Sequence, residues 1–305
     1  MVARFTLLLL IACGGARAQE TQALTAINGA RLYVRTIGSG DPLIIVHGGP
    51  GLNHAYFLPH LESLAKDHRL IFYDQRACGR SPIPAIDSLR FSFWVNDLES
   101  IRIWLGVEKV NLLAHSWGAL PAVAYGHAFP QHMGKLILSN PVPLSKEYDQ
   151  ALTEATRTRF TPADSTDRAI IIGSPGFKKG NAHAHEQLML FTFRHSFADE
   201  EKVRSLGLGL PPNFAAASVA LYQGLGPDLQ AYDWYDEAAQ FSFPLLIVHG
   251  QADVIPLACS QRLKTAAKNA SLVVFEKSGH FPFVEERKKF AQTIDYFLKK
   301  GIRPD

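Results

Sequence analysis

Residues 111–119 of this chain read Asn111-Leu112-Leu113-Ala114-His115-Ser116-Trp117-Gly118-Ala119. The apolar start of this stretch predicts a β-strand, and the alanine-rich residues that follow it predict a helix. A serine between a strand and a helix, with small residues around it, nearly matches the nucleophile elbow G-x-S-x-G. In that motif a sharp turn lifts the serine hydroxyl above a sheet. The stretch therefore predicts that Ser116 is a nucleophile, and the alternative is a serine that only caps a helix.

Short apolar runs recur on both sides of this stretch, and helical patterns follow several of them. The runs are continuous rather than alternating, as expected for strands that are covered on both faces in a parallel sheet. Apolar residues at helical spacing predict helices over residues 93–105 and 285–300. This alternation of strand and helix predicts a doubly wound α/β fold. The six runs span residues 43–46, 70–73, 110–113, 136–138, 245–248 and 272–275.

The alternation stops after the fourth run. Residues 142–241 are rich in Ala, Gln and Phe, lack clear strand runs and contain the pair Pro211-Pro212. We expect this segment to be mainly helical and to form a cap over the carboxyl ends of the strands, where ligands bind in open α/β sheets. The expected catalytic core then consists of residues 19–141 together with residues 242–305.

Two further residues complete a set for nucleophilic catalysis. With a nucleophile on a strand-to-helix turn, the expected chain order is serine, acid, histidine. Asp253 follows the run at 245–248, and His280 follows the run at 272–275. In this mechanism His280 takes the proton of Ser116 and later protonates the leaving group, while Asp253 fixes the histidine tautomer. The order and the strand-end positions predict a catalytic triad.

Acyl transfer also needs hydrogen-bond donors for the developing oxyanion. Glycine lets backbone N–H groups face a site without a Cβ in the way. We expect the N–H groups of Gly49 and Trp117 to form the oxyanion hole, with Gly48 as the alternative loop donor. His47 is expected to support the loop, and His115 to pack beside the serine. The glycine-rich turn that follows the first apolar run reads His47-Gly48-Gly49-Pro50-Gly51.

These motifs resemble the α/β-hydrolase superfamily and, within it, the proline iminopeptidase (prolyl aminopeptidase) family. The resemblance covers nearly everything after residue 25 apart from the cap. It implies a mostly parallel sheet of about eight strands with an inserted helical cap, and metal-free hydrolysis of amides or esters. Besides the glycine-rich turn and the elbow, it rests on the stretch Asp74-Gln75-Arg76-Ala77-Cys78-Gly79-Arg80-Ser81.

Two features depart from the family pattern. The family elbow usually reads G-G-S-W-G, whereas Ala114 and His115 precede the serine here. The family cap also carries glutamates for the substrate amino group, one of them in an E-N-H-Y-F-like run, but residues 190–197 hold no carboxylate. The resemblance therefore implies the mechanism rather than strict N-terminal proline specificity. Candidates for substrate binding in the cap are the carboxylates Glu186, Asp233 and Asp236 and the aromatic residues Phe193 and Trp234.

The N-terminal segment predicts export. A basic start and a short apolar run lead to Ala16-Arg17-Ala18, which fits the cleavage pattern of a secretory signal over residues 1–18. One alternative is a lipoprotein signal that ends before Cys13, which would then carry a lipid anchor, and another is a buried N-terminal strand. The apolar run is far shorter than the roughly 20 residues of a membrane-spanning helix. We expect a secreted or periplasmic enzyme, or alternatively a membrane-anchored lipoprotein.

The composition excludes several classes of protein. With 305 residues, 47% of them hydrophobic, and a net charge of +3, the chain is neither disordered nor basic enough for a nucleic-acid binder. Three cysteines are too few for a disulfide scaffold. Export permits a disulfide between Cys78 and Cys259, but we expect two free, partly buried thiols. No metal or cofactor motif is present, so the expected partner is a small-molecule or short-peptide substrate.

Three functions remain open at this point. The first is a serine aminopeptidase that releases N-terminal residues, favouring proline, and the second is a carboxylesterase or lactonase with the same triad. The third is a non-catalytic binding protein on this fold, which would usually lack a member of the triad. Haloalkane dehalogenase and epoxide hydrolase chemistry is disfavoured, because those relatives carry a carboxylate where Ser116 stands.

Overall fold

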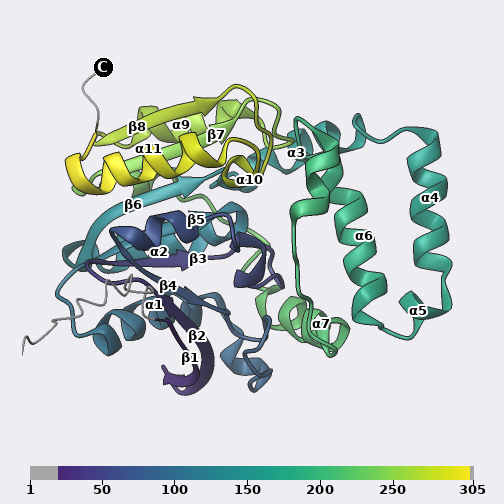
Figure 1. Cartoon of the computed structure of the whole chain (residues 1–305), viewed down its shortest axis with the longest axis horizontal. Coiled ribbons are helices and arrows are strands. Elements are labelled where there is room, and N and C mark those ends of the chain that lie inside the picture. The colour runs from purple at the N-terminus through teal and green to yellow at the C-terminus, as the bar shows by residue number, and fades with distance from the viewer. Residues whose placement is uncertain (1–19, 303–305) are drawn as a thin grey trace, which may run out of the picture.

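Residues 20–302 are described by a computed structural model, shown in Figure 1. They form one eight-stranded sheet with the strand order β1-β2-β4-β3-β5-β6-β7-β8. Helices cover both faces of the sheet, so the α/β architecture expected from the sequence is confirmed. The predicted signal peptide at residues 1–18 and the alternative lipid anchor at Cys13 lie outside the described residues.

The six apolar runs form the strands β3 to β8, and these strands pair in parallel. The first two strands are an antiparallel hairpin, and β2 also pairs antiparallel with β4. Most residues of the edge strand β1 are exposed, which explains why no apolar run marks it in the sequence. The strands are β1 (Glu20–Ile27), β2 (Ala30–Ile37), β3 (Pro42–Val46), β4 (Arg69–Tyr73), β5 (Val110–His115), β6 (Met133–Ser139), β7 (Leu245–Gly250) and β8 (Ala270–Phe275).

The helices of the sheet layers differ from the expected bounds at two places. The helix expected at 93–105 begins earlier, at Phe91, and the helix expected at 285–300 is interrupted at Glu286. Glu286 leaves the helical conformation, and its carboxylate accepts hydrogen bonds from Lys277 N (3.1 Å) and Ser278 Oγ (2.8 Å). The helices outside residues 142–241 are α1 (Phe91–Leu105), α2 (Ala119–Ala128), α9 (Leu257–Ala266), α10 (Pro282–Glu285) and α11 (Arg287–Lys300).

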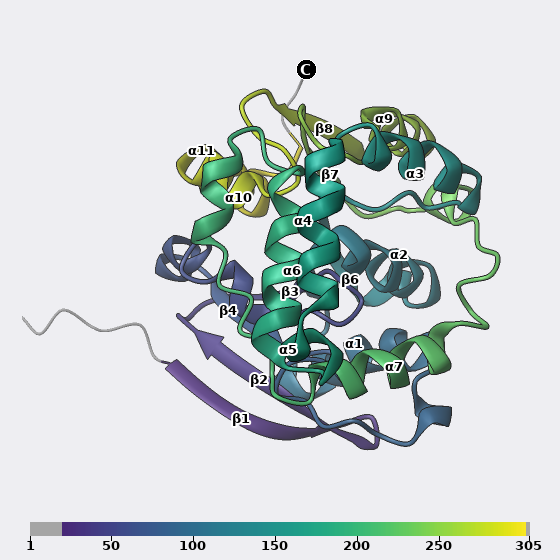
Figure 2. The ribbon, with the colours of Figure 1, turned by 90° about the vertical axis from the view of Figure 1, so that its right-hand side faces the viewer.

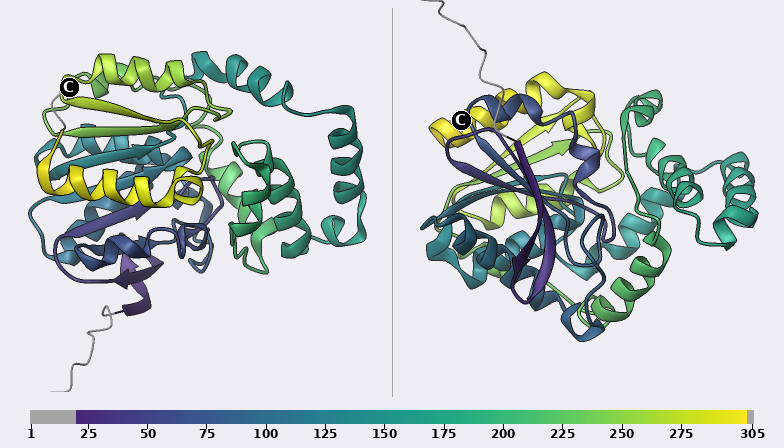
Figure 3. Two further views of the ribbon diagram at one scale, coloured as in Figure 1. Left: turned by 45° about the horizontal axis from the view of Figure 1, so that its top comes forward. Right: turned by 60° about the horizontal axis from the view of Figure 1, so that its bottom comes forward.

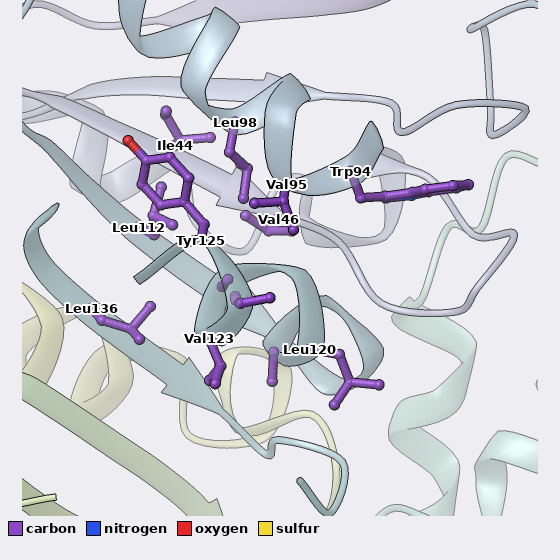
Figure 4. Close-up of a cluster of buried hydrophobic side chains, with 14 of the residues drawn as sticks. Ile44, Val46, Trp94, Val95, Leu98, Leu112, Leu120, Val123, Tyr125 and Leu136 are labelled. Carbon is purple, nitrogen blue, oxygen red and sulfur yellow. The ribbon is translucent and has the colours of Figure 1, made fainter. Parts of the chain in front are cut away.

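Alternate residues of the central strands fill two separate cores. Ile44 and Val46 pack under α1 and α2, where Figure 4 shows them with Leu112 and Leu136 of the neighbouring strands. Leu43 and other residues of the same strands face the opposite side and pack against α11. Burying one such aliphatic side chain contributes about 1.5–3 kcal/mol. Because both faces are covered, the strands need continuous apolar sequence, as the pattern indicated.

Between β6 and β7 the chain is helical. Figures 1 and 2 show α4 and α6 side by side, and they stand at the end of the sheet toward which the parallel strands point. Both views of Figure 3 show the same helices projecting from that end. Ser116 follows β5 at this end, so the helices lie on the side of the sheet where it emerges. They are α3 (Asp149–Arg157), α4 (Pro162–Gly173), α5 (Pro175–Lys178), α6 (Ala182–Arg194), α7 (Phe214–Leu225) and α8 (Tyr235–Ala238).

Both described cysteines are free thiols. Cys78 is 2% exposed and Cys259 is 3% exposed, so they are fully buried rather than partly buried as expected. Burial raises the pKa of the Cys78 thiol and raises that of Cys259 to about 11, which keeps both protonated at neutral pH.

Two further features of the described residues concern membrane-spanning helices and clusters of metal-binding side chains. Within residues 20–302, no helix combines the length and the apolar character that a membrane crossing needs. The same residues contain no group of three or more His, Cys, Asp or Glu side chains that could hold a metal ion.

Candidate active site

Ser116 occupies a strained turn between β5 and α2. Its φ is +56°, in the left-handed region that residues other than glycine rarely adopt and that tends to occur at functional sites. The neighbouring loops approach this turn so closely that larger side chains are excluded. A Cβ on Gly118 would lie 2.7 Å from the backbone oxygens of Val46 and His47, and one on Gly48 would lie 3.0 Å from the Cβ of Ser116. These contacts explain the small residues of the elbow motif.

Asp253 and His280 lie on the loops after β7 and β8 and form a buried pair. His280 Nδ1 donates to Asp253 Oδ2 at 2.9 Å and lies 3.1 Å from Oδ1. Asp253 is 7% exposed and His280 is 8% exposed. Burial by itself raises the pKa of the Asp253 carboxyl, but the charge and hydrogen bond of His280 and the hydrogen bond of Asn140 outweigh it and hold the pKa below its usual value. The structure therefore keeps this carboxylate ionised next to the imidazole.

The serine turn and the histidine loop meet through His115. The His115 ring centroid lies 4.7 Å from that of His280, and His115 Nε2 donates to the His280 carbonyl at 2.9 Å. Burial holds the pKa of His115 well below its usual value, so the ring is neutral and its Nδ1 can accept a hydrogen bond.

Tyr56 connects this histidine to the glycine-rich loop. Its hydroxyl accepts the N–H of Gly48 at 2.6 Å and donates to His115 Nδ1 at 2.9 Å. The side chain is completely buried. A continuous chain of hydrogen bonds thus runs from the Gly48 N–H through Tyr56 and His115 to the carbonyl of His280. The sequence carries no signal for this role of Tyr56, because the contact joins segments that are far apart.

The glycine-rich loop has the conformation that its glycines allow. Gly49 has a φ of +133°, and a Cβ there would lie 2.6 Å from the amide nitrogen of Gly51. His47 supports the loop, since its Nδ1 donates to the carbonyl of Gly48 at 2.8 Å and its Nε2 accepts the N–H of Gln75 at 3.0 Å. Burial lowers the pKa of His47 to about 4, so the ring is uncharged at neutral pH and supports the loop through these two hydrogen bonds.

The motif at residues 74–81 anchors this loop without reaching the serine turn. The Asp74 carboxylate accepts hydrogen bonds from the backbone N–H of His54 at 3.0 Å and from the ring Nδ1 of His54 at 2.7 Å. It also accepts the backbone N–H of Arg80 at 2.8 Å. Arg76 forms two 2.7 Å hydrogen bonds to the two oxygens of Asp97. Both side chains of this ion pair are almost fully buried. Arg76 therefore fastens residues 74–81 to α1.

Two segments between β6 and β7 touch the acid and base loops directly. Arg159 donates to the carbonyl of Asp253 at 2.9 Å and to that of Ala252 at 2.7 Å. The N–H of His280 donates to the carbonyl of Ser196 at 2.6 Å. Neither residue stands in a recognisable motif, so sequence reasoning could not single them out.

The structure places the first two cap candidates near the site. Glu186, on α6, accepts the N–H of Gly209 at 3.3 Å, and Gly209 in turn accepts a hydrogen bond from the Asn53 side chain in the segment after the glycine-rich loop. The ring of Phe193 meets the ring of Phe281 edge-on at 5.5 Å, next to His280. Phe193 is therefore connected to His280 through Phe281, and Glu186 is connected through Gly209 to Asn53, just after the glycine-rich loop.

The remaining cap candidates lie elsewhere. Trp234 lines a cavity of about 880 Å³ between α1, α2 and residues 227–237, and Asp233 lines it too. The ring centroid of Trp234 lies 6.1 Å from that of Phe91. The Phe91 ring in turn stacks on the indole of Trp117 at 5.8 Å. Asp236 is exposed on α8. This cavity contains none of the three triad residues.

Comparison with known proteins places this geometry in a family. The family model of the alpha/beta hydrolase fold matches residues 41–287. The proline iminopeptidase of Lactobacillus delbrueckii subsp. lactis is 27% identical over 307 residues, covering 92% of this chain and 98% of that protein. The proline iminopeptidase of Clostridium botulinum is 28% identical over 281 residues, covering 89% of this chain and 94% of that protein.

Solved structures show the same fold at lower identity. A proline iminopeptidase from Mycobacterium smegmatis has a TM-score of 0.68 at 19% identity, covering 92% of this chain and 98% of its own. An esterase from Exiguobacterium antarcticum has a TM-score of 0.67 at 23% identity, covering 92% of this chain and 100% of its own. Since the family match extends over well more than half of the sequence, the chain belongs to the alpha/beta hydrolase fold family.

Proposed function

We propose that this hydrolase cleaves small amide substrates through an acyl-enzyme on Ser116, and that it acts as an aminopeptidase of the proline iminopeptidase kind. The observation that carries the proposal is the buried hydrogen bond of 2.9 Å between His280 Nδ1 and Asp253. This bond fixes the tautomer that leaves His280 Nε2 free as a base. It lies beside a strained serine turn, and a strained turn is what an exposed nucleophile requires.

The proposed reaction assigns a role to each of these residues. His280 Nε2 takes the proton of the Ser116 hydroxyl as the oxygen attacks the substrate carbonyl, and Asp253 stabilises the imidazolium that forms. The tetrahedral oxyanion accepts hydrogen bonds from the backbone N–H groups of Gly49 and Trp117. His280 then protonates the leaving amine, and a water molecule activated by the same histidine releases the acyl group from Ser116.

Hydrogen bonding within the glycine-rich loop supports Gly49 as the loop donor. The N–H of Gly48, the alternative, already donates to the Tyr56 hydroxyl at 2.6 Å. An oxyanion at Gly48 would have to displace that buried bond, whereas preorganised donors stabilise a transition state because they need no rearrangement.

The choice between peptidase and esterase rests on two different observations. Relatives named proline iminopeptidase match 89–92% of this chain over 94–98% of their own lengths, which supports a peptidase. The absence of a carboxylate at residues 190–197 favours the alternative, a carboxylesterase or lactonase with the same triad, because a substrate ammonium needs an anionic partner. Among the carboxylate candidates, Glu186 is the one linked through Gly209 to Asn53, two residues after the glycine-rich loop.

The experiment that tests the proposal is a panel of aminoacyl p-nitroanilides and short-chain p-nitrophenyl esters, compared for wild type and Ser116→Ala. The proposal predicts the highest kcat/KM on prolyl p-nitroanilide and loss of that activity in the variant. Activity on the esters alone would favour the alternative. Turnover that survives Ser116→Ala would contradict the acyl-enzyme.

We also propose that the mature chain is exported, on the basis of the signal-like residues 1–18. The N-terminus of the protein recovered from its natural host tests this. A first residue of Gln19 supports a cleaved secretory signal, and a lipid-modified Cys13 supports the lipoprotein alternative. An intact Met1 contradicts both.

A further inference from the structure

Glu285, at the end of α10, is a buried carboxylate that takes no part in the proposed chemistry. It is 9% exposed. One oxygen, Oε2, accepts the N–H of Gly279 at 2.6 Å. The other, Oε1, accepts the N–H groups of Ala198 at 2.8 Å and of Asp199 at 3.2 Å. The side chain therefore joins two segments that are about 80 residues apart in the sequence.

Both segments adjoin the base. Gly279 immediately precedes His280, and the N–H of His280 donates to Ser196 at 2.6 Å. A Cβ on Gly279 would lie 2.0 Å from the Ser196 carbonyl oxygen, so the two backbones are in direct contact. The rings of Phe197 and Phe281, the residues that follow Ser196 and His280, stack at 4.7 Å. Residues 196–199 thus contact the histidine loop at Gly279, His280 and Phe281.

A carboxylate is needed at this position because it offers an acceptor oxygen to each segment. Glutamine has the same shape but only one acceptor oxygen, and its NH2 group would oppose an N–H donor. Burial raises the pKa of the Glu285 carboxyl above its usual value even though three backbone N–H groups bind it. An ionised buried carboxylate is costly unless its hydrogen bonds are satisfied, so this arrangement is not one that generic packing would favour.

We propose that Glu285 is a positioning residue, which clamps residues 196–199 to Gly279 and so holds His280 in register with Asp253. It acts through the backbone of the histidine loop and does not touch the substrate. The inference rests on the proposed function, since it concerns the base of that reaction. Arg159 makes the equivalent connection on the acid side, where it binds the carbonyl of Asp253 at 2.9 Å. The cap and the acid–base pair are therefore one unit at this end of the site.

The test compares Glu285→Gln with wild type in two assays. The assays are kcat and KM on prolyl p-nitroanilide and the rate at which a fluorophosphonate probe labels Ser116. We expect kcat and the labelling rate to fall about 10- to 100-fold, the scale of a catalytic group misplaced by about 1 Å, while KM stays within about twofold because the substrate contacts are unchanged.

Glu99→Gln is the matched control. Glu99 is also a largely buried carboxylate with several partners, Arg102, Tyr125 and His132, but it lies on α1 and has no bond to the histidine loop. We expect Glu99→Gln to lose thermal stability without a comparable loss of kcat in the folded protein. Equal losses of kcat in the two variants would overturn the positioning role.

Further outcomes separate the two proposals. A folded Glu285→Gln with the wild-type kcat and labelling rate overturns the role of Glu285, whereas wild type that is not labelled on Ser116 contradicts the proposed function. If Glu285→Gln does not fold, Glu285→Asp keeps both oxygens on a shorter arm. The proposal then predicts faster hydrogen exchange at the amides of both Gly279 and Ala198, together with a lower kcat. Faster exchange at an unchanged kcat overturns it.

Discussion

The side-chain amide of Asn140 donates a hydrogen bond of 2.6 Å to Asp253 Oδ2. The same amide group donates to the carbonyl of Gly279 at 3.1 Å, so Asn140 connects the loop that carries Asp253 to the loop that carries His280. Asn140 follows β6, is completely buried and has a φ of +49°, which asparagine tolerates better than most residues. The orientation of the Asp253 carboxylate is therefore supported by a residue that follows a third strand, β6.

Replacing this asparagine tests that dependence. Asn140→Ala removes a donor that lowers the pKa of Asp253, takes away the hydrogen bond of this amide to the Gly279 carbonyl and puts a less tolerant residue at positive φ. We expect a loss of about 1–3 kcal/mol in the free energy of unfolding, measured by urea titration, and a drop in kcat of roughly tenfold. Asn269→Ala is the control, because its exposed amide bonds only the carbonyl of Ser242. An Asn140→Ala variant with wild-type kcat would show that Asp253 is oriented without this contact.

Tyr56→Phe tests the chain of hydrogen bonds between the oxyanion loop and the base. The variant keeps the ring but leaves the N–H of Gly48 and Nδ1 of His115 without their shared partner. We expect a kcat about tenfold lower with little change in KM, because the loop donor matters most in the transition state. Tyr222→Phe, on the exposed face of α7, serves as the control and should behave as wild type. A larger effect on KM than on kcat would contradict this interpretation.

The pH dependence of stability tests the role of Asp74. Burial raises the pKa of this carboxyl, but the hydrogen bond and charge of His54 outweigh it and leave the folded pKa below its usual value. The resulting stabilisation is complete above the unfolded pKa of about 3.9, and it is lost as the pH falls through the lower folded pKa. Urea unfolding of wild type and Asp74→Asn should therefore differ most at neutral pH and converge toward pH 3. A difference that is independent of pH would contradict this linkage.

Glu186→Gln tests recognition of a substrate amino group. If this carboxylate pairs with the ammonium of an aminoacyl substrate, its loss should raise KM on prolyl p-nitroanilide about tenfold, the scale of a charge-assisted hydrogen bond. The N-acetylated anilide has no ammonium and provides the internal control, since the substitution should leave its KM unchanged. Equal changes on both substrates would assign Glu186 a structural role through its bond to Gly209.

The sequence was sufficient for the parallel strands of the sheet and for the chain order of the proposed triad. Strands β3 to β8 are covered on both faces and so need continuous apolar runs, which are local signals. The hairpin of β1 and β2 lacked such a signal, because β1 lies at the exposed edge. Asn140 has a partial sequence signal, because it comes directly after a strand and before Pro141, and an Asn-Pro pair is typical of turns.

The supporting residues could not be read from local sequence. Tyr56, Arg159 and Glu285 bind backbone groups of segments far from them in the chain, and nothing near each residue records that contact. For the aromatic candidates Phe193 and Trp234, the sequence shows that they share one segment but does not show where each lies in the fold. Phe193 lies beside Phe281 and Trp234 lines a separate cavity, although both belong to the same aromatic-rich segment. Placing them required the path of the chain between β6 and β7.

In the proposed mechanism Ser116 is the nucleophile and the Asp253–His280 pair activates it. Exposure to a fluorophosphonate probe, followed by intact-protein and peptide mass spectrometry, tests both roles. We expect one adduct per chain, on the peptide that contains Ser116, with none in Ser116→Ala and slow formation in His280→Ala. Labelling at another residue, or labelling that Ser116→Ala leaves unchanged, would contradict this mechanism.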